Sequence, residues 1–293
     1  MMYYITYGFL WFISILPFPV LYFLSDGFYG LVFYILKYRR KVVMDNLLLA
    51  FPEKTDKERL AIAKKFYHNL IDTFIETIKM ISVSEKTILK RFTGNWEVIN
   101  AFHGTGRKVQ IHAGHNFNWE WCNVSCPVAL KMPFLAVYMP ISNKNFERIV
   151  YKFRSRFGTK LLRATHMRED FMPYRNEEYA LALAADQNPG NPGNAWWFNF
   201  FGKPAPFVKG PAKGAVTNDA AVVFAFIHKV RRGYYEAVFT VAENDPASST
   251  EQEITGKFVK YLEGVIRQYP DMWLWSHRRW KWEWNEGYGE VRN

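Results

Sequence analysis

The amino-terminal part of the chain is strongly apolar. Residues 1–25 carry no charged side chain, and residues 3–23 are almost wholly hydrophobic. As a helix rising ~1.5 Å per residue, this run is about as long as the ~30 Å hydrocarbon core of a bilayer is thick. Pro17 and Pro19 interrupt it, so a kinked or re-entrant helix fits as well as a straight span. A signal peptide is not expected, because no basic residues precede the run and no clear small-residue cleavage site follows it.

A second aromatic-rich stretch ends at Ile35 and is followed by the basic residues Lys37, Arg39, Arg40 and Lys41. Lysine and arginine concentrate on the cytoplasmic side of membrane segments, so we expect the residues beyond 37 to remain cytoplasmic. The pattern predicts a membrane anchor over 1–37, formed by one transmembrane or re-entrant helix and an interfacial stretch. A cytoplasmic-face catalytic domain is expected over 38–293. The alternative is a very hydrophobic core helix packed inside a soluble protein.

The rest of the chain alternates between helical and strand patterns. Residues 40–82 are helical in pattern, and Thr55 followed by Glu58 has the form of a capping box. From about residue 105, short apolar runs alternate with amphipathic stretches. Strands are predicted at 108–111, 134–138, 180–185, 221–228 and 234–241, and helices at 119–126, 143–157 and 250–269, with Pro127 ending the first of these helices. This alternation predicts an α/β fold in which a sheet is flanked by helices, behind the apolar N-terminal region.

Composition narrows the class of protein. Hydrophobic residues make up 49% of the chain, which excludes a disordered protein, and eleven tryptophans suit pocket mouths or membrane interfaces. The formal net charge of +11 indicates an anionic partner: nucleic acid, an anionic membrane or an acidic carrier protein. Residues 273–284 interleave tryptophan with basic side chains, which suits lipid headgroups, single-stranded nucleic acid or simple packing. The apolar N-terminus favours the membrane, and nucleic acid is not expected.

The cysteine content excludes a disulfide-rich scaffold. Only Cys122 and Cys126 occur, so a reducing compartment is expected. His112 and His115 lie nearby, which makes a metal site conceivable. Four ligands within one turn and one helix rarely converge as a tetrahedron, however, so neither a metal nor an organic cofactor is predicted.

The strongest candidate for chemistry is the segment from His115 to Glu120. It follows a predicted strand and opens a predicted helix, at the edge where open α/β sheets place ligands. A histidine paired with a carboxylate can deprotonate a hydroxyl near neutral pH. Without a Gly-x-Ser-x-Gly elbow, direct attack by the substrate hydroxyl is favoured over a covalent acyl-enzyme. The alternative is a capping Glu120 beside a solvent-facing His115, and His112 is expected to be structural.

These residues resemble a known family. The His-x4-Glu-Trp pattern is similar to the motif of the late lipid A acyltransferases, within the lysophospholipid and glycerophosphate acyltransferase group. The resemblance covers nearly the whole chain, and the tryptophan-rich blocks look most like the versions found in Bacteroidetes. The matching blocks are HNFNWEW at 115–121, RKVVMDNLLLAFP at 40–52, ADQNPG at 185–190, WWFNFFGKPAPFVKG at 196–210 and WLWSHRRWKW at 273–282.

The resemblance implies a reaction and a location. The reaction is acyl transfer from an acyl carrier protein thioester to a hydroxyl of a lipid A precursor, at the cytoplasmic face of the bacterial inner membrane. His115 would be the base and Glu120 its partner. An arginine of the family would contact acceptor phosphate, and an aspartate turn would match Asp186. The residues expected to bind substrate are Arg163, Arg168, Asp186, Gln187 and Lys209.

One departure from the family leaves alternatives open. Relatives often carry glutamate where this chain has Ala212. A different acceptor, such as a glycerophosphate or an amino-acid lipid, is therefore an alternative, as is a membrane-anchored lipid-binding protein without turnover. The aromatic residues Trp196, Trp197 and Phe198 are candidates for the wall of an acyl slot, for an interfacial segment or for ordinary core.

Overall fold

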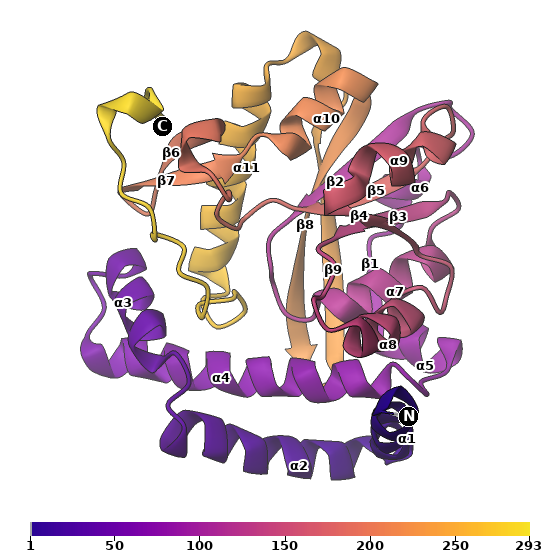
Figure 1. Cartoon of the computed structure of the whole chain (residues 1–293). Coiled ribbons are helices and arrows are strands. Elements are labelled where there is room, and N and C mark those ends of the chain that lie inside the picture. Colours follow the sequence, from indigo (N-terminus) through magenta and orange to yellow (C-terminus); the bar gives the residue numbers. More distant parts are fainter. Residues whose placement is uncertain (1) are drawn as a thin grey trace.

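The computed structural model describes residues 2–293 and has a seven-stranded sheet with helices on both faces (Figure 1). The strand order is β1-β9-β8-β2-β5-β3-β4. Neighbouring strands from β8 to β4 are parallel, whereas β9 pairs with β8 as an antiparallel hairpin. The predicted α/β class is confirmed. The strands are β1 (Phe92–Gly94), β2 (Lys108–Ala113), β3 (Phe134–Tyr138), β4 (Lys160–Arg163), β5 (Ala180–Ala184), β8 (Ala220–Arg231) and β9 (Tyr234–Glu243).

Side-chain alternation along the strands assigns each helix to a face of the sheet. His112 and Gln110 of β2 face α10 (Gly210–Asn218) and α11 (Glu251–Gln268), where His112 meets the ring of Phe258 and Gln110 lies near Gly214. The alternate residues Ile111 and Ala113 face the other side, toward the helix that follows β2. The helices of the domain are α5 (Glu85–Arg91), α6 (Glu97–Asn100), α7 (Trp119–Ala129), α8 (Lys144–Arg154), α9 (Met167–Phe171), α10 (Gly210–Asn218) and α11 (Glu251–Gln268).

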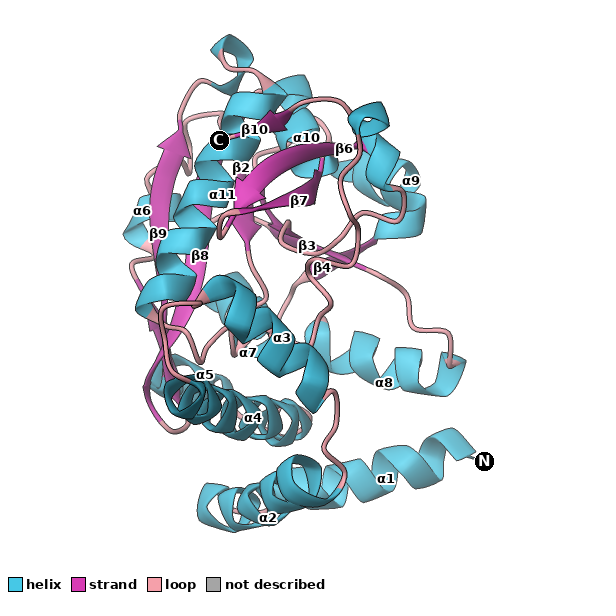
Figure 2. Cartoon of the chain, turned by 90° about the vertical axis from the view of Figure 1, so that its left-hand side faces the viewer, coloured by secondary structure: helices cyan, strands magenta, loops and turns pink. Residues whose placement is uncertain are grey.

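A small second sheet lies apart from the main one (Figure 2). It consists of β6 (Ala195–Phe200), β7 (Lys203–Val208) and β10 (Val291–Arg292). Trp197 of β6 is 1% exposed and stacks on Tyr288 with ring centroids 5.4 Å apart. The aromatic run 196–201 is therefore largely packing in this hairpin.

The helix after β2 does not end at Pro127 as predicted but continues to Ala129. Proline lacks the N–H that would bond the carbonyl of Asn123, four residues earlier. The Thr159 hydroxyl donates to that carbonyl at 2.8 Å, so the carbonyl keeps a partner and the helix continues. The strands β1, β4, β6 and β7 were not predicted. Strands β1 and β4 have only three and four residues, β6 is a nearly continuous aromatic run, and β7 contains Pro204 and Pro206.

The apolar run over residues 3–23 is two helices and not one. Helix α1 (Met2–Ile15) ends before Pro17, which is the N-cap of α2 (Phe18–Gly30), and a π-helical turn, Leu31–Ile35, extends α2. Among the described residues, Phe18–Ile35 is the stretch long and apolar enough to cross a membrane, and only 17% of it is buried. Proline at the start of α2 replaces N–H groups that have no intrahelical acceptor, so the break falls there.

Helix α2 lies along α4 (Asp56–Lys79) and on the far side of α4 from the sheet (Figure 1). The Tyr22 hydroxyl bonds Glu76 at 2.8 Å, and the Ser25 hydroxyl bonds Asp72 at 2.7 Å, so the two helices run antiparallel. Helix α3 (Arg40–Ala50) connects them. The predicted capping box is present at the start of α4, where Thr55 accepts from the Glu58 amide.

Candidate active site

Strand register brings His115 and Asp186 together. In the sheet, Ala113 of β2 pairs with Ala184 of the parallel strand β5. The residues two positions further along each strand, His115 and Asp186, therefore leave the same edge of the sheet side by side. This carboxyl edge is where open α/β sheets bind ligands.

Asp186 holds His115 through both of its carboxylate oxygens. Its Oδ1 lies 2.6 Å from the Nδ1 of His115, and its Oδ2 accepts the His115 backbone N–H at 2.8 Å. The indole N–H of Trp273 donates to the same Oδ2 at 2.7 Å. Asp186 is 1% exposed, so its position is set from several directions by buried donors.

This geometry defines the protonation of the imidazole. A carboxylate can only accept, so Nδ1 of His115 carries the proton and Nε2 presents its lone pair. The amide nitrogen of Gln187 lies 3.2 Å from that Nε2, where it can donate. His115 is partly accessible, with 22% of its side chain exposed. Nε2 is thus the atom available to take a proton from a substrate.

The charges around His115 shift the pKa values of both groups. Burial opposes the charged form of Asp186, but the imidazole of His115 and the surrounding N–H donors lower the pKa of Asp186 to about 2. Burial also opposes the charged form of His115, yet Asp186 and the nearby Glu120 raise the pKa of His115 above its ordinary value. At neutral pH Asp186 is ionised, and the free base of His115 becomes populated as the pH rises through the raised pKa.

The carboxylate bonded to His115 is that of Asp186 and not, as predicted, that of Glu120. Glu120 lies in the first turn of α7 and is 6% exposed. It pairs with the guanidinium of Arg154 from α8, whose Nε is 2.9 Å from Oε2, and it accepts the Trp119 indole N–H at 3.2 Å. A helix that begins at residue 119 turns Glu120 toward α8, whereas His115 stays at the strand edge.

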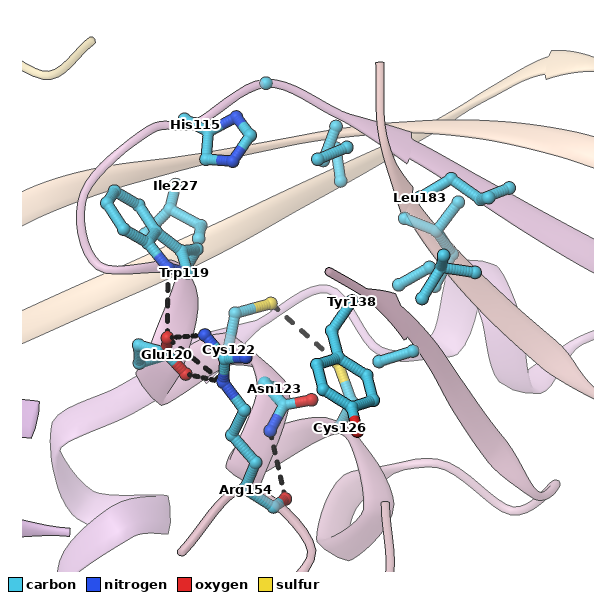
Figure 3. Close-up of a pocket in the computed structure, with 18 of the residues that line it drawn as sticks. His115, Trp119, Glu120, Cys122, Asn123, Cys126, Tyr138, Arg154, Leu183 and Ile227 are labelled. Atoms are coloured by element: carbon cyan, nitrogen blue, oxygen red, sulfur yellow. Dashed lines mark hydrogen bonds and ion pairs between the residues drawn. The ribbon is translucent and has the colours of Figure 1, made fainter. Parts of the chain in front are cut away.

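An apolar cavity of about 470 Å³ opens beside His115 (Figure 3). Ligand pockets commonly enclose roughly 300–1,000 Å³. Trp119, Cys122 and Cys126 of α7 form one wall, and the ring of Trp119 meets that of His115 at 5.4 Å. The Glu120–Arg154 pair lines the same cavity. The free thiols of Cys122 and Cys126 lie 3.8 Å apart in this wall.

Small residues on adjacent strands create the space. Ala113 pairs with Ala225 of β8 on one side and with Ala184 of β5 on the other, and Ala182 of β5 pairs with Ala136 of β3. All five alanines line the cavity and together form its floor. Branched side chains at these positions would fill the gap between the sheet and α7, as they do where sheets pack closely on helices.

The remaining predicted site residues fall in different places. Gln187 lines the cavity, as does His115. Arg163 makes a bidentate ion pair with Asp170, with its Nε at 2.8 Å, and Arg168 is exposed on α9. Lys209, the N-cap of α10, lies over the ring of Trp196 of the small sheet at 4.0 Å. None of these three basic residues lines the cavity.

Two further residues of the sequence analysis are buried in the core. Ala212 is 2% exposed on α10 and does not line the cavity. His112 is 2% exposed, and burial lowers its pKa to about 3, so it is a neutral structural histidine as expected. The cation that does line the cavity, Arg154, was missed. It is one of several basic residues around α8, and nothing in their sequence pattern distinguishes it.

Arg154→Met is expected to destabilise the protein by about 3–5 kcal/mol, because it leaves the buried Glu120 charge without its partner. The measurement is the thermal unfolding midpoint of the full-length protein in detergent. Arg163→Met is the matched control, since it breaks an ion pair of the same type at the surface. Equal shifts in the two variants would contradict the assignment of the Glu120 pair as a buried one.

A histidine base at the mouth of an apolar cavity, carried on an α/β domain, suits an enzyme that transfers an acyl chain. Comparison with known proteins agrees: the chain belongs to the family of bacterial lipid A biosynthesis acyltransferases, whose family description matches residues 1–282. The resemblance seen in the sequence blocks is therefore confirmed.

Characterised relatives align over almost the same span. The chain is 24% identical over 284 residues to the lipid A biosynthesis palmitoleoyltransferase of Escherichia coli strain K12, covering 94% of this chain and 89% of that protein. It is likewise 24% identical over 280 residues to the lipid A biosynthesis lauroyltransferase of the same organism, with the same coverage. A lipid A biosynthesis acyltransferase of Shigella flexneri matches at 24% over 284 residues.

Proposed function

We propose that this protein transfers a fatty acyl chain from an acyl carrier protein thioester to a hydroxyl of a lipid A precursor, with His115 as the base and Asp186 as its carboxylate partner. The observation that carries the proposal is the position of Nε2 of His115. Its ring is held by the buried Asp186, and Nε2, which lies near the side-chain amide of Gln187, stands at the mouth of a cavity floored by alanines.

The proposed reaction uses this geometry. The Nε2 of His115 accepts the proton of the acceptor hydroxyl while the oxygen attacks the thioester carbonyl. The carbon–sulfur bond then breaks, and the imidazolium returns its proton to the leaving thiolate. Asp186 keeps the tautomer and stabilises the imidazolium, in the role that the aspartate of a catalytic triad has. Glu120, held by Arg154, adds negative charge near the ring.

The acyl chain occupies the alanine-floored cavity. Its walls are mostly apolar, and it extends from His115 at the carboxyl edge of the sheet to Ile111 of β2 and to Phe134 at the amino end of β3. The formal charge of +11 supports an acidic carrier protein as donor. Arg163, Arg168 and Lys209 lie outside the cavity, where contact with acceptor phosphate or with the carrier is open to them.

Membrane attachment is proposed through α1 and α2 lying in the interface, with the catalytic domain facing the cytoplasm. Large apolar side chains project outward from both helices, among them Phe9 at 63% and Phe23 at 77% exposed. Because α2 runs along α4, a span by α2 would draw exposed lysines of α4 into the hydrocarbon. If α1 and α2 lie in the plane of the membrane interface, their outward apolar side chains enter the lipid while the lysines of α4 stay in water.

The test is an acyl-transfer assay with the full-length protein in vesicles. Labelled acyl-acyl carrier protein is offered with a tetra-acylated lipid A precursor and, in parallel, with lysophosphatidic acid. Transfer to the lipid A precursor is expected. Transfer to lysophosphatidic acid alone would show that the acceptor is a lysophospholipid and not a lipid A precursor. No transfer to either acceptor, or acylation of the precursor without need of His115, would contradict the proposal.

Ala182→Leu is expected to shorten the preferred acyl chain. The added carbons fill the floor of the cavity deeper than Ala184, displacing about three methylene positions at ~0.8 kcal/mol each, so kcat/KM for the longest accepted chain falls by about 10–100-fold. Donors of graded chain length compete in one reaction, and products are read by mass spectrometry. The shorter chains are the internal control, because a uniform loss across all lengths would place the effect outside the cavity.

A further inference from the structure

Glu76 of α4 is a buried carboxylate that the reaction itself does not use. It is 1% exposed and does not line the cavity beside His115. Its Oε1 accepts the Tyr22 hydroxyl of α2 at 2.8 Å. Its Oε2 accepts the Asn118 amide at 2.7 Å and the Tyr235 hydroxyl of β9 at 2.8 Å. A buried carboxyl group requires such hydrogen-bond partners, so Glu76 and its partners determine one another's positions.

Asn118 belongs to the loop that carries His115. It is fully buried and directly precedes the first residue of α7. The neighbouring Phe117 packs its ring 5.7 Å from that of Phe66 on α4. One turn into α7, the Trp121 indole donates to the main-chain carbonyl of Glu76 at 3.2 Å. Helix α4 therefore supports the loop and the start of α7, while Asp186 supports His115 itself.

Helix α2 reaches the same carboxylate from the other direction. Tyr22 faces Glu76, whereas the next residue, Phe23, is 77% exposed on the outer face of α2. That outer face is the one we assign to the membrane. The carboxyl group of Glu76 is therefore hydrogen-bonded both to α2, through Tyr22, and to the active-site loop, through Asn118.

We propose that Glu76 is a positioning residue for the His115 loop and that, through Tyr22, it makes the geometry of this loop depend on the seating of helix α2. The proposal rests on the proposed function of His115 as the base. A displacement of about 1 Å at a reacting group can lower a rate by about 100-fold, so loss of one of these hydrogen bonds changes turnover without changing any residue that contacts substrate.

A second link between the same two helices provides a matched control. The Ser25 hydroxyl donates to the buried Asp72 at 2.7 Å, much as the Tyr22 hydroxyl donates to Glu76. Asp72 also pairs with His68, Arg232 and Lys229, none of which belongs to residues 114–121, so this link joins α2 to α4 without a direct contact to the loop. Tyr22→Phe and Ser25→Ala each remove one hydroxyl and nothing that contacts substrate.

The experiment compares the two variants in the full-length protein bound to vesicles. Tyr22→Phe is expected to lower kcat by about 5–10-fold, with KM for the acyl donor within about twofold of wild type. Amide hydrogen exchange over residues 114–121 should become faster, while exchange in β2 and β5 stays unchanged. Ser25→Ala should leave kcat and the exchange of 114–121 at wild-type values.

Equal effects of the two variants on kcat and on loop exchange would overturn the proposal, as would unchanged loop exchange in Tyr22→Phe. Glu76→Gln keeps the side-chain shape but replaces one accepting oxygen by a donor, and it should show the same loop-specific pattern. The exchange measurement does not require turnover. It therefore measures the coupling of α2 to the loop even if the wild type acylates neither acceptor. Such a lack of acylation would contradict the proposed function and not the coupling.

Discussion

Replacement of His115 by alanine is expected to lower kcat by about 10³–10⁴-fold. In the proposed mechanism Nε2 of His115 takes the acceptor proton. Positioned general bases contribute about 10²–10⁴ to a rate, with more lost when the leaving thiolate also needs the returned proton. KM for the acyl donor should change little, because the alanine-floored cavity remains intact. Initial rates are measured with the full-length protein, labelled acyl-acyl carrier protein and the lipid A precursor.

The control for this prediction is His103→Ala. His103 is exposed in the turn after α6, is not among the cavity residues, and is 3.4 Å from Glu178. It should retain wild-type turnover. If His115→Ala keeps more than about a tenth of the wild-type kcat, the loss is smaller than the about 10²–10⁴-fold that general bases contribute, and His115 is not the base.

Asp186→Asn is expected to be nearly as damaging, by about 10³–10⁴-fold in kcat, because it imposes the wrong tautomer. Oδ2 of Asp186 accepts both the His115 backbone N–H and the Trp273 indole N–H, so the asparagine oxygen must occupy that position. The asparagine NH₂ then faces Nδ1 of His115 and donates to it. Nε2 carries the proton in this arrangement and cannot accept another.

The pH profile distinguishes this mechanism from simple misfolding. Burial opposes the charged imidazole, but Asp186 raises the pKa of His115 above its ordinary value, so wild-type kcat/KM should rise with pH through that raised pKa. Removal of the Asp186 charge lowers the pKa of His115. The residual activity of Asp186→Asn should therefore reach its plateau at lower pH than wild type.

Asp170→Asn is the matched control, because it makes the same chemical change in the ion pair with Arg163, away from the cavity. Wild-type rates and an unshifted pH profile are expected for it. An acid limb in Asp186→Asn that stays at the wild-type pH, or moves to higher pH, would show that Asp186 does not set the pKa of His115.

The sequence alone determined the architecture and singled out His115 as the candidate base. Alternation of short apolar runs with amphipathic stretches reports how each element packs, and it correctly predicted the sheet, most of its strands and the helices α4, α8 and α11. The position of His115 after a strand and before a helix is also local information. The whole-chain blocks then indicated the family, as the comparison with relatives confirmed.

Only the tertiary structure decided what surrounds His115. Asp186 is 71 residues away along the chain, and the pairing of β2 with β5 is what brings the two side chains together. Glu120, five residues from His115, is turned toward Arg154 by the start of α7. Spacing along the chain predicts side-chain contacts only within one regular element. His115 lies in a loop and Glu120 in a helix, so their spacing does not predict a contact.

The cavity could not be predicted from the sequence for a similar reason. Each alanine of its floor is unremarkable in its own strand, and an aromatic run elsewhere, at residues 196–198, was the more conspicuous candidate for an acyl slot. The space exists because the registers of β8, β2, β5 and β3 set small residues beside one another beneath α7. Sequence periodicity records which side of a strand faces the core, whereas the volume left empty depends on residues from several strands at once.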